Sequence, residues 1–141
     1  MIFPDINVLI YAHKQGAVHH EEYAAWLTQT IETERFATAN IILSGFIRIT
    51  THPKLYTPPS TLEEALTFCH NLVNQPNCTV VTPTTAHWTI FTRLCQDINA
   101  RGNDVTDAYL AALAVEHDCE FMTADKSFRR FPGLHWRHPL E

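Results

Sequence analysis

Three aspartates, far apart along the chain, stand at the ends of segments that predict regular structure. Asp5 directly follows a short apolar segment, Asp125 follows another after Thr123 and Ala124, and Asp107 opens an alanine-rich segment. Carboxylates gathered in one place repel one another and raise each other's pKa values. A divalent cation such as Mg²⁺ or Mn²⁺ removes that conflict, because hard ions prefer oxygen ligands. The three residues therefore predict an acidic metal site, although each one alone is also typical of a helix cap or a turn.

Short apolar segments alternate with helical patterns, and this alternation must position the aspartates. Strands are predicted at residues 1–3, 35–37, 79–81, 120–122 and, more weakly, 134–136. Helical spacing of apolar residues predicts helices at 23–31, 42–50, 62–73, 88–98 and 108–115, with Asn40 as an N-cap and Thr61 with Glu64 as a capping box. Strands that alternate with helices indicate an α/β fold with a central, mostly parallel sheet covered on both faces. The carboxyl ends of such strands, where Asp5 and Asp125 fall, are where sites form.

Composition narrows the class of protein. The chain has 141 residues, of which 45% are hydrophobic and 18% charged, so we expect a single domain over residues 1–141 rather than disorder. A net charge of −5 does not suit a protein that coats duplex nucleic acid by charge, but bound metal ions can reverse the local sign. No signal-peptide pattern and no apolar stretch of about 18 residues occurs, which predicts a cytoplasmic protein without a membrane segment. The four cysteines lack C-x-x-C spacing and predict buried thiols.

Three segments carry a resemblance to a known family. They are DINVLIYA at residues 5–12, TDAYLAALA at 106–114 and TADKSF at 123–128. In this order, over almost the whole chain, they resemble PIN-domain proteins, and among these the VapC toxins of type II toxin–antitoxin pairs. The resemblance implies a PIN-like three-layer α/β/α domain with endoribonuclease activity that depends on Mg²⁺ or Mn²⁺.

The resemblance also implies roles for particular residues. Asp5, Asp107 and Asp125 would hold the metal and orient a water for attack on an RNA phosphodiester. Asn7 and Thr123 match positions that support the carboxylates by hydrogen bonding, although Asn7 could instead cap the first helix. The implied partners are an RNA substrate, a VapB-like antitoxin protein and a second copy of the chain in a homodimer.

One position departs from the family pattern. Gly45 stands where the family has a glutamate, in the segment SGFIR at residues 44–48. Two hypotheses follow: Gly45 leaves water-filled room beside the metal, or it permits close helix packing. The loss also leaves open a catalytically degenerate module that binds RNA or a protein without cleavage, or compensation by Asp104.

Positive charge could contact the RNA from two places. Arg48 lies on a polar helix stripe and is a candidate phosphate contact. A second group near the C-terminus either guides RNA to the acidic site or is a solvated turn; its members are Lys126, Arg129, Arg130 and Arg137.

Overall fold

Five short strands form one parallel sheet in the computed structural model, which describes all residues from 1 to 141. The strands are β1 (Ile2–Pro4), β2 (Phe36–Thr38), β3 (Cys78–Val80), β4 (Glu120–Met122) and β5 (Trp136–Arg137). Their order across the sheet is β3-β2-β1-β4-β5, and every neighbouring pair is parallel. The predicted parallel sheet is confirmed, with β1 at its centre.

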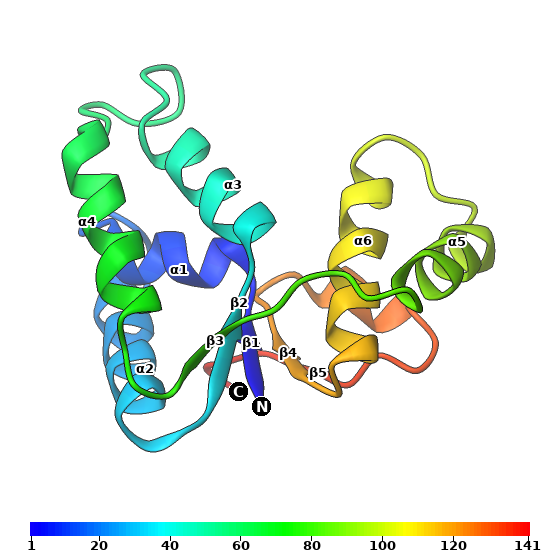
Figure 1. The fold of residues 1–141 in the computed structure, drawn as a ribbon. Helices are drawn as coiled ribbons and strands as arrows, with labels where there is room; N and C mark the ends of the chain where they lie inside the picture. The colour runs from blue at the N-terminus through cyan, green and yellow to red at the C-terminus, as the bar shows by residue number, and fades with distance from the viewer.

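Helices cover the sheet on both sides. They are α1 (Ile6–His13), α2 (His20–Thr33), α3 (Asn40–Thr50), α4 (Leu62–Val73), α5 (His87–Ile98), α6 (Asn103–Glu116) and the short 3₁₀ helix η1 (Lys126–Arg130). Figure 1 shows α1 to α4 on one side of the central strands and α5 with α6 on the other. This arrangement confirms the expected three-layer α/β/α architecture.

The alanine-rich helix α6 lies between α5 and the sheet, where it contacts both α5 and β4. Four of its alanines have no exposed surface: Ala108, Ala111, Ala112 and Ala114. Small side chains on all sides allow this close approach, as the nearly continuous apolar sequence predicts. The packing fixes the helix that carries Asp107 against the strand that leads to Asp125.

Several helix ends differ from the sequence prediction, and two of these differences concern residues with a predicted role. The Asn40 cap is wrong: Ala39 is the N-cap of α3 and Asn40 is its first helical residue, with no side-chain capping bond. Helix α6 begins at Asn103, so Asp107 lies more than one turn inside it instead of opening it. The capping box of α4 is confirmed, because Thr61 and Glu64 exchange side-chain to backbone hydrogen bonds of 3.1 and 3.2 Å.

The cysteines form no disulfide. Cys69 and Cys119 are buried thiols, as predicted, whereas Cys78 and Cys95 are only partly buried. No helix has both the length and the apolar character needed to cross a bilayer.

Candidate acidic site at the sheet edge

The candidate site lies where the strand order reverses. From β1 the chain builds the sheet outward through β2 to β3, and then returns to place β4 on the opposite side of β1. Crevices at such reversal points, at the carboxyl ends of the strands, commonly hold ligands. The amide of Asp5 donates to the Met122 carbonyl at 2.8 Å, so the ends of β1 and β4 are joined directly at this point.

Asp5 is the most constrained carboxylate of the site. Only 6% of the residue is exposed, and it is the N-cap of α1, with Oδ1 accepting from the Ile6 amide at 2.7 Å. Its Oδ2 accepts a hydrogen bond of 2.7 Å from the hydroxyl of Thr123, a buried residue that follows β4. Both oxygens are thus held by the protein, each by a donor from a different part of the chain.

Thr123 and Asn7 form a small network around Asp5. The Thr123 hydroxyl accepts from the Asp125 amide at 3.0 Å and from Asn7 Nδ2 at 3.3 Å, while Asn7 Oδ1 accepts from the Ala124 amide at 3.3 Å. Thr123 contacts a carboxylate directly, whereas Asn7 acts through Thr123 and the backbone. The alternative in which Asn7 caps the first helix does not hold, because Asp5 occupies that position.

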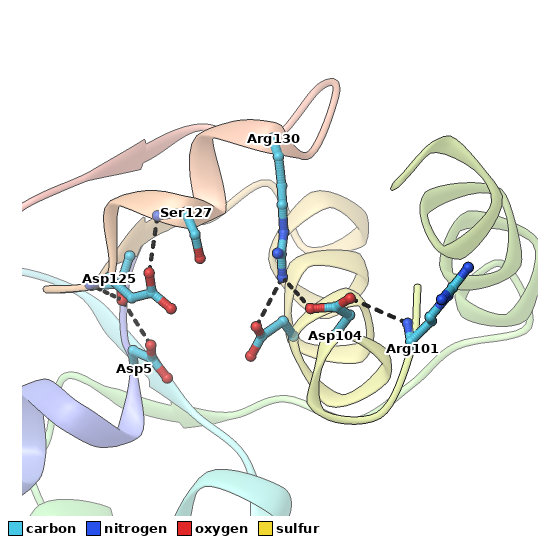
Figure 2. Close-up of polar contacts among 8 residues, drawn as sticks. Asp5, Arg101, Asp104, Asp125, Ser127 and Arg130 are labelled. Atoms are coloured by element: carbon cyan, nitrogen blue, oxygen red, sulfur yellow. Dashed lines mark hydrogen bonds and ion pairs between the residues drawn. The ribbon is translucent and has the colours of Figure 1, made fainter. Parts of the chain in front are cut away.

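Burial dominates the electrostatics of Asp5. The pKa of this carboxyl is raised from 3.8 to about 6, mainly by burial. The hydrogen bonds from Thr123 and Ile6 lower the pKa, and the negative charges of Asp107 and Asp125 add smaller increases. The three predicted aspartates are therefore near enough to interact. Figure 2 shows Asp5 and Asp125 at the sheet edge, with Arg130 reaching toward α6.

Asp107 is paired with a cation of the protein itself. Its Oδ2 lies 3.0 Å from Nη2 of Arg130, and the same nitrogen lies 3.2 Å from Oδ1 of Asp104. Burial raises the pKa of Asp107, and the Arg130 guanidinium opposes that rise. Asp104 also accepts from the Arg101 amide at 3.2 Å, so both of its oxygens have partners at the start of α6.

The sequence did not single out Arg130 from its basic neighbours. Lys126 and Arg137 form ion pairs of 2.9 Å elsewhere, with Glu141 and Glu120, and Arg129 is exposed without an ion pair. Only Arg130 reaches the carboxylates. The basic cluster near the C-terminus is visible in the sequence, but the sequence does not indicate which of its side chains points toward the aspartates.

The remaining predicted residues lie nearer to solvent. Asp125 is exposed and is the N-cap of η1, with Oδ1 accepting from the Ser127 amide at 2.9 Å. Arg48 is exposed on α3, and its side chain forms no ion pair or hydrogen bond. Its orientation leaves it available to a ligand but places it in no network.

Gly45 faces an apolar side chain. A Cβ atom at this buried position would lie 2.7 Å from Cδ1 of Ile6 on α1. The expectation of water-filled room beside Gly45 is therefore wrong, because the Ile6 side chain fills that space. The alternative, close packing of α3 against α1, describes this position.

The candidate ligands are chemically suited to a hard divalent cation, but their side chains are not placed to bind one ion together. All candidate ligands are carboxylate oxygens, which Mg²⁺ and Mn²⁺ prefer, and the raised pKa of Asp5 marks unfavourable charge that a cation would offset. No three Asp, Glu, His or Cys side chains lie close enough to hold one ion together in this arrangement. One oxygen of Asp107 is already paired with Arg130.

Comparison with known proteins adds independent information. The family model described as PIN domain matches residues 2–134. The VapC ribonuclease Mb2897 of Mycobacterium bovis is 36% identical over 142 residues, covering 100% of this chain and 97% of that protein. Ribonuclease VapC25 of Mycobacterium tuberculosis is 30% identical, covering 99% of this chain and 100% of that protein.

Solved structures show the same fold at low sequence identity. VapBC2 from Rickettsia felis, bound to a DNA fragment from its promoter, superposes with a TM-score of 0.72 at 17% identity and covers 98% of both chains. VapBC-1 from nontypeable Haemophilus influenzae gives a TM-score of 0.71 at 18% identity and covers 100% of both chains.

Proposed function

This chain belongs to the PIN-domain family and, within it, to the VapC ribonucleases, and from this premise we propose that it is a metal-dependent endoribonuclease that acts as the toxin of a type II toxin–antitoxin pair. The observation that carries the proposal is the 2.7 Å bond from Thr123 to buried Asp5, with Asp125 two residues further along the chain. It ties residues from both ends of the sequence into one acidic edge. We also propose that residues 1–141 form a single PIN-like domain.

In this proposal Asp5, Asp107 and Asp125 hold Mg²⁺ or Mn²⁺. When bound, such a cation lowers the pKa of a water and offsets the negative charge that develops on the phosphoryl oxygens, so no nucleophilic side chain is needed. Thr123 supports the mechanism by donating to Asp5 Oδ2, which limits rotation of that carboxylate. Asn7 holds the turn after β4 through the Ala124 amide and so positions Asp125.

The substrate side of the site is the exposed one. Asp125 lies at the surface, whereas Asp5 is buried behind it. RNA would approach from the Asp125 side, and the exposed guanidinium of Arg48 on the neighbouring helix α3 is our candidate for a phosphate contact. A toxin that cleaves RNA acts in the cytoplasm, where its substrate is.

The partners follow from the same relatives. The solved structures named above are VapBC complexes, and we propose that a VapB-like antitoxin binds this chain and that two copies form a homodimer. Expression of the chain alone should arrest bacterial growth, and co-expression of the small reading frame next to its gene should relieve the arrest. Arrest that persists with every neighbouring frame would contradict the antitoxin proposal.

A panel of cellular RNAs tests the activity. We expect fragments in Mg²⁺ or Mn²⁺, none in EDTA, and a rate at least ~100-fold lower for Asp125→Asn, because that variant keeps the shape but loses a charged ligand. Asp97→Asn, an exposed aspartate of α5 without an ion pair, is the matched control and should cleave normally. Binding of RNA without cleavage in any divalent cation would instead support the catalytically degenerate module. The argument for that alternative is that position 45 is glycine and not the glutamate of the family pattern.

A further inference from the structure

Arg130 connects the segment that carries Asp125 to helix α6, which carries Asp107. It lies at the end of η1, five residues after Asp125, and its Nη2 reaches Asp107 Oδ2 at 3.0 Å and Asp104 Oδ1 at 3.2 Å. Asp104 and Asp107 are three residues apart and therefore lie on the same face of α6. Figure 2 shows the guanidinium of Arg130 extended over the start of this helix.

The arginine is held in this position and is not a freely moving surface group. Its side chain is 32% exposed, its Cζ lies 5.1 Å from the centre of the Phe131 ring, and its Nε is buried without a hydrogen-bond partner. A buried donor without a partner is unfavourable. The two ion pairs are the interactions that offset this cost.

The same contact occupies an oxygen that the nuclease reaction needs. While Oδ2 of Asp107 accepts from Arg130, that oxygen is occupied by the guanidinium. A single positive charge placed on a cluster of four aspartates also lowers their mutual repulsion in the absence of metal. A divalent cation that binds Asp107 must therefore compete with Arg130.

We propose that Arg130 is a tethered cation that takes the place of the divalent metal on Asp107 and releases that carboxylate when the metal binds. The proposal rests on the proposed function, since it takes Asp107 as a metal ligand. Asp104 provides the second partner for Arg130. It already contacts the same nitrogen and can keep the guanidinium paired after Asp107 has bound the metal. Arg130 thus sets the metal concentration at which the site fills.

Mn²⁺ titration of two charge-matched variants tests the competition. Arg130→Gln removes the competing cation, and Arg129→Gln removes the same charge from the exposed neighbouring residue. Calorimetry should show Mn²⁺ binding about tenfold tighter in Arg130→Gln and within about twofold of the parent in Arg129→Gln, because Coulomb energy falls with distance and with solvent exposure. In EDTA, Arg130→Gln should melt at a lower temperature than the parent, and saturating Mn²⁺ should remove that difference.

Three other results of the Mn²⁺ titration would contradict the proposal or its premise. Weaker binding in Arg130→Gln would show that Arg130 positions Asp107 for the metal and would overturn the proposal. Equal tightening in both variants would reduce the effect to net charge and would overturn it as well. Absence of Mn²⁺ binding in the parent and in both variants would instead refute the proposed function.

A measurement on the unaltered protein covers the case in which Arg130→Gln does not fold without metal. Side-chain guanidinium signals in NMR spectra can be followed during titration with Mg²⁺, which is diamagnetic. The Arg130 signal should shift with the same midpoint as the backbone amide of Asp107, while that of Arg129 stays unchanged. An Arg130 signal that does not move at Mg²⁺ saturation would refute the competition.

Discussion

Replacing Asp5 with Asn should stabilise the metal-free protein near neutral pH, because the variant removes a charge that burial makes unfavourable. The pKa of Asp5 is about 6 in the folded chain against 3.8 in an unperturbed one. This difference corresponds to about 3 kcal/mol of unfolding free energy when the carboxyl is ionised. The amide nitrogen of the variant cannot accept the Thr123 hydrogen bond, which costs about 1 kcal/mol. The expected net gain is about 2 kcal/mol, or a melting temperature higher by about 7 °C for a chain of 141 residues.

The pH dependence of this gain identifies its cause. A carboxyl with a raised pKa destabilises the fold above that pKa, and the cost is lost as the pH falls through about 6 toward 4, because the folded chain takes up the proton first. At about pH 5 roughly 1.5 kcal/mol of the cost remains, so the net advantage of the variant should fall below about 1 kcal/mol.

Urea unfolding in EDTA, near neutral pH and at about pH 5, measures both values. Asp97→Asn makes the same chemical change at an exposed site on α5 and should leave stability nearly unchanged at both pH values. An Asp5→Asn protein no more stable than the parent near neutral pH would refute the reasoning. So would an advantage of equal size at both pH values, because a charge effect must fade with protonation.

Three further predictions concern the neighbourhood of the site and the surface. Thr123→Val removes a hydrogen bond that lowers the pKa of Asp5, so carboxyl NMR titration in EDTA should find that pKa above about 6; an unchanged value would contradict the role of Thr123. Gly45→Ala should raise the free energy of unfolding by about 1 kcal/mol through helix propensity, but only in combination with Ile6→Val, which removes the Cδ1 atom 2.7 Å from the new methyl group. Urea unfolding of the single and double variants measures this coupling. Additive effects of the two substitutions would contradict it. Exposed apolar side chains such as Trp88, 70% exposed, leave surface for a second copy, so light scattering should give twice the mass of one chain, and a monomer would contradict the dimer.

Much of the fold could be predicted because local apolar segments mark the strands. The segment predicted at residues 120–122 coincides with β4, and the one at 1–3 is displaced by a single residue. That displacement arises because Pro4 pairs with Met122 in the sheet although proline has no amide hydrogen. Helix starts are less certain, because residues 103–107 are polar and do not show where α6 begins.

The site could be predicted only where topology dictates it. Asp5 and Asp125 follow adjacent parallel strands, and the carboxyl ends of such strands always share an edge. The contact between Arg130 and Asp107 depends instead on which way one side chain turns at the end of η1, and no local pattern specifies that direction. The contact of Gly45 with Ile6 joins α3 to α1 and is likewise invisible in the sequence.

The bond between Thr123 and Asp5 spans 118 positions of the chain, and this separation has a consequence for protein synthesis. Chains leave the ribosome with the N-terminus first, and β1 has only β2 beside it until β4 emerges. A nascent chain that ends before residue 107 carries one of the three aspartates. We therefore expect translating ribosomes not to be cleaved by the chains that they are still making, and products that terminate before residue 107 to have no nuclease activity.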